Sequence, residues 1–184
     1  MNKIVSVFTL VFASFAAQAE SILDNTMFGV SVINQDVNVA VKLAGTTVNV
    51  EESGTGFGVY LDKYHQGKYR FNTTLSYVGY DAFDFASMTV AADYLVPYNK
   101  QLSFFAGVSA GGGMQQYADM SLADASSGLL YGAQLGGIAY LNKELMLEVG
   151  YRQRIVNVET DIDSGGTTLV DEQSELYLSF LLMF

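Results

Sequence analysis

The end of the chain carries the pattern that most constrains its fold. The last eleven residues read Ser-Glu-Leu-Tyr-Leu-Ser-Phe-Leu-Leu-Met-Phe, and counting by twos from the end gives one unbroken apolar row: Leu176, Leu178, Phe180, Leu182 and Phe184. Successive side chains of a strand point to opposite faces, so one face of this strand is wholly apolar. At the edge of a soluble sandwich, which is the alternative, such a strand would invite aggregation. In a barrel closed within lipid, the apolar row faces acyl chains and the edge is paired.

This final strand resembles that of outer-membrane β-barrel proteins, whose last strand ends in Phe and is read by the barrel-assembly machinery. The resemblance implies that the row ending in Phe184 is an assembly signal. It also implies that the assembly machinery is a partner during biogenesis.

The beginning of the chain has the pattern of a secretory signal. Lys3 precedes an apolar run over residues 4–16, and Ala17-Gln18-Ala19 forms a small-x-small cleavage site. A membrane anchor is the alternative, but the run is shorter than the roughly 20 residues that a spanning helix needs. We therefore expect a signal peptide over residues 1–19, a barrel domain over residues 20–184, and export through the periplasm.

Composition excludes several classes of protein. Without the signal peptide, eight basic residues remain against 19 acidic ones, a net charge of −11, so the chain lacks the basic patch that nucleic acid requires. Cysteine is absent, so an exported chain must fold without disulfides. No later segment has 18 uninterrupted apolar residues, so no transmembrane helix competes with a barrel. Twelve Tyr and twelve Phe suit aromatic girdles at two membrane interfaces.

Alternation along the chain predicts eight strands: one from residue 27, then 55–64, 69–77, 87–97, 102–111, 128–141, 145–155 and 174–184. Short turns alternate with longer polar loops, predicted at 81–84, 112–127 and 159–172. Residues 35–53 fit either a hairpin that turns near Gly45 or a long outer loop. The layout predicts an all-β, eight-stranded, antiparallel up-and-down transmembrane barrel. Essentially the whole mature chain resembles the OmpA/OmpX-type eight-stranded family, without pointing to one member.

The inward row of these strands carries charges of both signs. An eight-stranded barrel is just wide enough for side chains to fill it, and isolated buried charges would be costly. We therefore expect a salt-bridged lumen network that plugs the barrel. A narrow gated pore for small solutes or ions is the alternative. The predicted network consists of Asp62, Arg70, Asp93, Glu148, Arg152, Arg154 and Glu175.

Charges outside the lumen separate by sign along the barrel axis. Basic residues lie near the predicted periplasmic turns, at Lys63, Lys68, Lys100 and Lys143. Acidic residues concentrate on the outer side, at Glu51, Glu52, Asp81, Asp84, Asp119, Asp124, Glu159, Asp161, Asp163, Asp171 and Glu172. The segment from Asp161 to Gly166 has some of the spacing of a calcium loop but lacks its closing Glu, so an acidic surface loop is favoured. We expect no metal and no cofactor.

An enzymatic role is not expected. A serine hydrolase needs a base beside its nucleophile, and the single histidine, His65, falls at a periplasmic turn, away from the outer leaflet that holds lipid A. Modification of lipid A is therefore the third hypothesis, behind a structural or surface-interaction role and a narrow channel. Because no further domain is expected, peptidoglycan binding is not carried over from the family. The expected partners are outer-membrane lipid and lipopolysaccharide in a Gram-negative cell, with the protein as a monomer.

Overall fold

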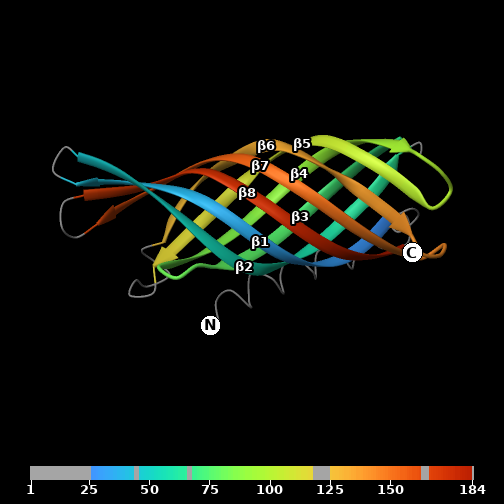
Figure 1. The fold of residues 1–184 in the computed structure, drawn as a ribbon, viewed down its shortest axis with the longest axis horizontal. Helices are drawn as coiled ribbons and strands as arrows, with labels where there is room; N and C mark the ends of the chain where they lie inside the picture. The colour runs from blue at the N-terminus through green and yellow to red at the C-terminus, as the bar shows by residue number, and fades with distance from the viewer. Residues whose placement is uncertain (1–25, 44–45, 66–67, 118–124, 163–165, 184) are drawn as a thin grey trace, which may run out of the picture.

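The structure is a computed structural model, and it describes residues 26–43, 46–65, 68–117, 125–162 and 166–183. These residues form eight strands that close into a barrel (Figure 1). The predicted signal peptide, with Ala17 and Ala19, and the terminal Phe184 lie outside the described residues. The strands are β1 Thr26–Leu43, β2 Thr46–His65, β3 Tyr69–Gly79, β4 Phe83–Pro97, β5 Leu102–Tyr117, β6 Ser126–Tyr140, β7 Leu145–Ile162 and β8 Gly166–Met183.

Each strand is antiparallel to the next, and β8 closes the barrel by pairing with β1. The closing pair runs from Met27 opposite Met183 to Lys42 opposite Thr167, with one irregularity beside Asn38. The predicted fold class, an all-β, eight-stranded, antiparallel up-and-down barrel, is confirmed. In the described ranges, no helix is long and apolar enough to cross a membrane.

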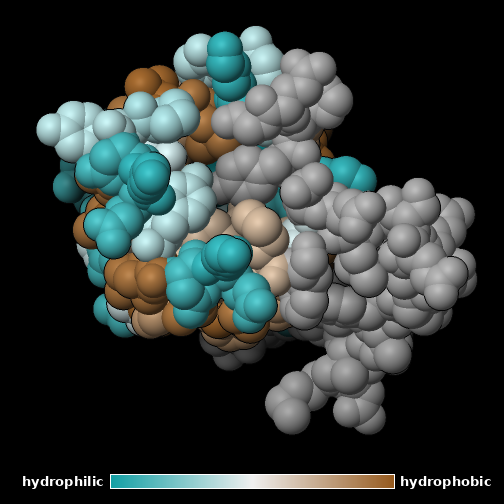
Figure 2. Space-filling view, turned by 90° about the vertical axis from the view of Figure 1, so that its right-hand side faces the viewer, coloured by the Kyte–Doolittle hydropathy of each residue, from teal (hydrophilic) through white to brown (hydrophobic). Residues whose placement is uncertain are grey.

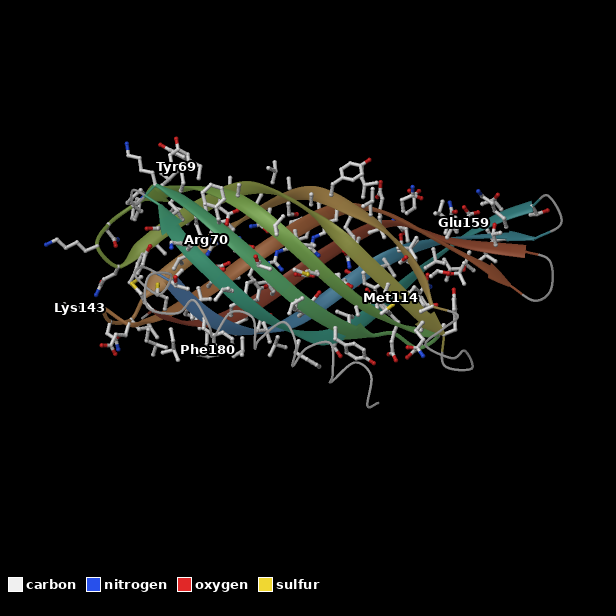
Figure 3. All side chains as sticks on the ribbon, turned by 180° about the vertical axis from the view of Figure 1, so that it is seen from behind. Tyr69, Arg70, Met114, Lys143, Glu159 and Phe180 are labelled. Carbon is white, nitrogen blue, oxygen red and sulfur yellow. The ribbon has the colours of Figure 1, made fainter. Side chains whose placement is uncertain are left out.

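Side chains alternate between the lumen and the outer wall along each strand, except at the irregularity in β8 where Asp171 and Glu172 are both exposed. On β8, the outward residues of the predicted assembly row are exposed: Leu176 by 56%, Leu178 by 40%, Phe180 by 52% and Leu182 by 47%. Figure 3 shows Phe180 on the outside of the wall and Arg70 within it. The outer wall is therefore a belt of apolar side chains, as the period-two pattern of the sequence predicts.

The two ends of the barrel differ. At the short-turn end, four-residue turns follow β4 and β6, and their backbone bonds include Tyr98 N to Leu102 O at 3.0 Å and Leu141 N to Leu145 O at 3.0 Å. Figure 2 looks onto this end, where hydrophilic side chains gather with hydrophobic ones around them. At the opposite, long-hairpin end, β1 with β2 and β7 with β8 project beyond the rest of the barrel (Figure 1).

The projecting part is a four-stranded outer sheet in the order β2-β1-β8-β7, formed by residues 46–53, 36–43, 166–174 and 158–162. Pairing of β2 with β3 stops at Thr55 opposite Gly79, and pairing of β6 with β7 stops at Asn157 opposite Leu129. For residues 35–53, the structure selects the hairpin alternative. Within the described residues, the long polar loops predicted at 112–127 and 159–172 are wrong over most of their length, because β5 continues to Tyr117, β6 begins at Ser126, and β7 with β8 form a hairpin.

The reason for the longer strands is an upper apolar layer inside the long-hairpin end. Phe83 stacks on Tyr80 with ring centroids 4.6 Å apart and lies 5.7 Å from the Tyr117 ring. Burying these side chains keeps their backbone in the sheet rather than in a loop. The buried members of this layer are Val37, Val39, Val78, Tyr80, Phe83, Phe85, Leu130, Val156, Val158 and Val170.

A lower apolar layer fills the lumen near the short-turn end. Its side chains are exposed by 3% or less: Met27, Leu95, Phe105, Ile138, Met146 and Leu181. The charged part of the lumen thus lies in the middle of the interior, and at both ends large apolar side chains share the inward row with uncharged polar ones such as Ser103 and Thr160.

Inward glycines make room for large lumen side chains. A Cβ atom at Gly150 would overlap the Tyr177 ring, and one at Gly136 would lie 2.6 Å from Cζ of Phe105. At these two positions, the close approach of an aromatic ring requires glycine.

Gly150→Ala should therefore lower the free energy of unfolding by about 1–3 kcal/mol, because overpacking displaces Tyr177. Urea titration of protein refolded into phospholipid vesicles measures this. The matched control is Gly137→Ala, on the outward row, whose added Cβ would meet nothing closer than Cδ1 of Phe104 at 3.7 Å. Equal stability of the two variants would contradict the packing described for Gly150.

Candidate functional site

All seven charged residues of the predicted lumen network lie inside the barrel. Their exposed fractions are 1–2%, so none of them faces bulk water. They come from β2, β3, β4, β7 and β8, because each occupies an inward position of its strand. The structure brings them into two groups, one around Arg70 and one around Glu175.

Arg70 is the centre of the first group. Its Nε and Nη2 donate to Oδ2 of Asp93 at 2.9 and 2.8 Å. Its two terminal nitrogens also donate to Glu148, the Nη2–Oε1 distance being 3.3 Å. Asp62 is the weakest partner, with Oδ2 at 3.5 Å from Nη1. The guanidinium also lies 4.5 Å from the Phe105 ring centroid, so it rests on the lower apolar layer.

Glu175 is the centre of the second group. Arg152 Nη1 donates to its Oε1 at 2.6 Å, Arg154 Nη1 to its Oε2 at 3.3 Å, and Gln35 Nε2 to its Oε2 at 2.8 Å. Arg152 also lies over Tyr177, with Cζ 3.9 Å from the ring centroid. Two arginines thus share one carboxylate in this group.

Neutral side chains join the two groups. Gln134 donates to Oδ1 of Asp93 at 2.6 Å and accepts from Arg152 Nε at 3.0 Å. The Tyr177 hydroxyl donates to Oε1 of Glu148 at 2.7 Å. The arrangement is a continuous polar network across the lumen, whose members can be worth more together than pair by pair.

Above Glu175, Tyr80 covers the network from the connection between β3 and β4. Its hydroxyl donates to Oε1 of Gln35. Burial, with a smaller contribution from the Glu175 charge, raises the pKa of this hydroxyl. Tyr80 therefore remains a neutral donor and links the network to the upper apolar layer.

Sequence reasoning missed the neutral members of the network. The inward parity of Asn72, Gln134 and Tyr177 was visible, but charge alone selected the candidates, and Gln35, Tyr80 and Gln173 fell outside the predicted strands. The additional members are Gln35, Asn72, Tyr80, Gln134, Gln173 and Tyr177.

The network has an imbalance at Asp62. Three carboxylates surround Arg70, and Asp93 and Glu148 hold the shorter contacts. Oδ1 of Asp62 is buried and has no hydrogen-bond partner among the described residues, as is also true of the Tyr60 hydroxyl and Ser31 Oγ. Unpartnered buried polar atoms are costly unless water reaches them.

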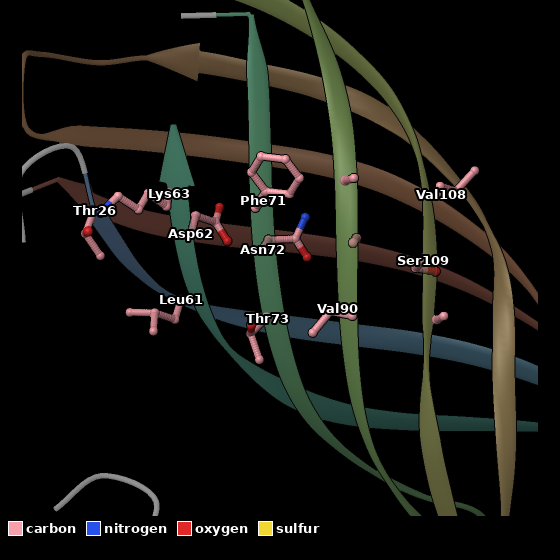
Figure 4. A pocket seen from close by; sticks show the side chains of 13 residues that line it. Thr26, Leu61, Asp62, Lys63, Phe71, Asn72, Thr73, Val90, Val108 and Ser109 are labelled. Atoms are coloured by element: carbon pink, nitrogen blue, oxygen red, sulfur yellow. The ribbon is translucent and has the colours of Figure 1, made fainter. Parts of the chain in front are cut away.

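A hollow of about 470 Å³ extends along the wall from β2 to β5 (Figure 4). Leu61, Phe71, Val90 and Val108 line it from outward positions, and Asp62 lies at its inner side. Because most lining side chains belong to the outward row, the hollow is a depression in the apolar outer wall.

Most exposed charges separate by sign. Lys68, Lys100 and Lys143 are exposed near the short turns, whereas Glu51 and Glu159 are exposed on the outer sheet; Glu144 at a short turn and Lys42 on the outer sheet are exceptions. Figure 3 shows Lys143 and Glu159 at opposite ends. Two hollows of about 380 and 510 Å³ on the outer sheet share lining residues Asn38, Glu51 and Glu172. Asp119, Asp124 and Asp163 lie outside the described residues.

Neither a metal site nor a catalytic base is assigned. Over the described ranges, no three His, Asp or Glu side chains are placed to bind a metal ion together. His65 ends β2 opposite Tyr69, but its side chain lies outside the described part of the chain.

The fold matches known membrane barrels. Neisserial surface protein A has a TM-score of 0.64 at 13% identity, with 84% of this chain and 97% of that chain covered. OprG, an outer-membrane protein from Pseudomonas aeruginosa, gives a TM-score of 0.62 at 13% identity, covering 88% and 96%. The outer-membrane protein AlkL gives 0.53 at 15% identity, covering 90% and 94%. The chain has the fold of an outer-membrane barrel.

The sequence comparisons add no closer relative. No protein-family model matches the chain, and no curated protein matches it in sequence. The likeness to the three barrels therefore concerns the fold.

Asp62→Asn should leave the free energy of unfolding unchanged or raise it, because the substitution removes a poorly paired buried charge. Asp93→Asn is the matched comparison and should lower it by about 3–5 kcal/mol, since Asp93 is held by Arg70, Asn72 and Gln134. Both values come from urea titration in vesicles. A larger loss for Asp62→Asn than for Asp93→Asn would refute this ranking of the carboxylates.

Proposed function

We propose that this protein is a monomeric integral barrel of the Gram-negative outer membrane, with a plugged lumen and a structural or surface-interaction role. The observation that carries the proposal is the charge network enclosed between two apolar layers. A pore would need a continuous polar path, and large apolar side chains occupy much of the inward row at both ends, beside polar ones such as Ser103, Gln115, Thr160 and Thr168.

The outer wall supports insertion into a membrane. Tyr69 and Tyr94 pair near the short-turn end, with ring centroids 5.6 Å apart, and Phe57 and Tyr77 pair at 5.8 Å nearer the long-hairpin end. Between them lies the apolar belt that includes Phe180. Aromatic girdles flanking an apolar band are typical of outer-membrane barrels, and in this setting lipid tails would fill the hollow in the wall.

The two ends of the barrel support one orientation. Outer-membrane barrels have short periplasmic turns and longer external loops, so the outer sheet would lie outside the cell. The assembly machinery would then read the final row, Leu176 to Phe184, at the periplasmic end. The acidic outer sheet would repel lipopolysaccharide phosphates unless divalent cations bridged them, and it would attract cationic partners.

The proposal includes no catalytic step. In the proposed orientation, His65 at the end of β2 lies on the periplasmic side, whereas lipid A lies in the outer leaflet. A nucleophile at the outer rim would therefore lack this histidine as its base.

A narrow channel is the second candidate. Its support is the set of unpartnered buried polar atoms in the described lumen, among them Ser31 Oγ, Tyr60 Oη, Ser109 Oγ and Ser179 Oγ. Water bridging these atoms would make part of a path, which a change in ion pairing could extend.

Conductance across a planar bilayer distinguishes the two candidates. Refolded protein, verified by its heat-modifiable migration, should give a silent bilayer, since the apolar layers block the lumen. Reproducible small conductance that changes in Arg152→Ala, but not in the exposed control Lys143→Ala, would overturn the plugged lumen and establish the channel.

A further inference from the structure

The outer half of β2 is a free sheet edge. Residues 46–53 pair with β1 on one side, and in the described chain they have no strand on the other, because β3 begins its pairing at Thr55. A free edge presents a row of backbone N–H and C=O groups that can pair with another chain. The edge is eight residues long, enough for one average strand.

This edge is also uncovered on both faces. Residues 46–51 are all exposed, and the inward-facing Val48 and Val50 are exposed by 56% and 42%. On the opposite side of the same sheet, Val158 and Val170 are each 0% exposed. Among the side chains that the structure describes on the two edges of the outer sheet, exposed apolar ones therefore lie beside free backbone groups on the β2 side.

Carboxylates lie beside the two valines. Glu51 faces outward. In its cross-strand row, Asn38 of β1 lies between Glu51 and Glu172 of β8, and Asp36 lies on the same face in the next row. Glu52 faces inward, and its Oε2 has no hydrogen-bond partner among the described residues. The free edge thus combines apolar side chains with carboxylates on both of its faces, and the exposed Lys42 of β1 lies opposite Thr47 further along the outward face.

We propose that an extended, basic and apolar segment of another polypeptide binds here by adding a strand to β2. Its apolar side chains contact Val48 and Val50 on the inward face, and its Lys or Arg side chains lie opposite Glu51 on the outward face. Backbone bonds supply affinity and the alternate side chains supply specificity, as in other strand additions. The inference deepens the proposed surface role and rests on the outer sheet being outside the cell.

A second copy of the chain fits this edge less well. Two copies inserted in one membrane have their β2 strands running in the same direction, so the antiparallel pairing of two β2 edges is not available to them. Each copy would also bring its own Glu51 and Glu52, which repel like charges. A separate peptide can approach in either direction and can carry the complementary charge.

The test uses full-length refolded protein in zwitterionic nanodiscs and three labelled peptides. The probe is Lys-Val-Lys-Val-Lys-Val-Lys. A block peptide, Lys-Lys-Lys-Lys-Val-Val-Val, has the same composition without alternation, and Glu-Val-Glu-Val-Glu-Val-Glu reverses the charge. Fluorescence anisotropy gives the affinity, and hydrogen–deuterium exchange locates the binding site.

We expect the alternating Lys peptide to bind more tightly than the block peptide and to slow amide exchange within residues 46–53. Glu51→Lys should weaken binding of the Lys peptide about fivefold, which corresponds to the free energy of an exposed ion pair, and should strengthen binding of the Glu peptide. The matched control, Glu159→Lys, changes an exposed carboxylate on the far strand of the same sheet and should leave both affinities unchanged.

Three results would overturn the inference: equal binding of the block peptide, an equal loss in Glu159→Lys, or no protection at residues 46–53. Protection of residues 46–53 at rising protein concentration without peptide would also overturn it and assign the edge to a second copy. Failure of peptide binding in protein that gives a silent bilayer refutes only the strand addition. A conducting bilayer refutes the proposed function instead.

Discussion

Burial of charge within a closed barrel is the constraint on which the rest of this structure depends. Seven ionisable side chains lie inside a wall whose interior is only wide enough for side chains. Each buried charge costs several kcal/mol unless hydrogen bonds and an opposite charge offset the lost hydration. The pairing of Arg70 with Asp93 and Glu148, and of Glu175 with two arginines, is therefore a requirement of the fold as well as a candidate site.

Other features follow from that requirement. Glycine at 150 lets the Tyr177 ring reach across the lumen, so that its hydroxyl can donate to Glu148. The apolar layers above and below exclude water, which strengthens the ion pairs between them. The upper layer also extends β5, β7 and β8 beyond the predicted strands, and the outer sheet with its acidic face grows from that extension. The packing of the lumen thus links the charge network to the outer sheet.

Period-two alternation predicted the barrel, its eight strands and the inward position of every lumen charge, because parity on a strand is a local property. It could not predict how far the strands continue. Val158 and Val170 look like loop residues beside Glu159 and Asp171, and only the apolar layer contributed by distant strands keeps them in a sheet. The sequence did not predict the neutral partners of the network for a similar reason. Gln134 contacts Asp93 and Arg152 across strands, and no local pattern in the sequence indicates these contacts.

A double-mutant cycle on Arg152 and Glu175 tests the central claim most directly, namely that the lumen charges act as paired groups that hold the barrel closed. The free energy of unfolding in vesicles is measured for Arg152→Met, Glu175→Gln and the double variant. Each single change should cost about 3–5 kcal/mol, and the double variant should cost less than their sum by about 0.5–3 kcal/mol. Strictly additive losses would show that the two groups do not interact, and would contradict the network as the element that closes the lumen.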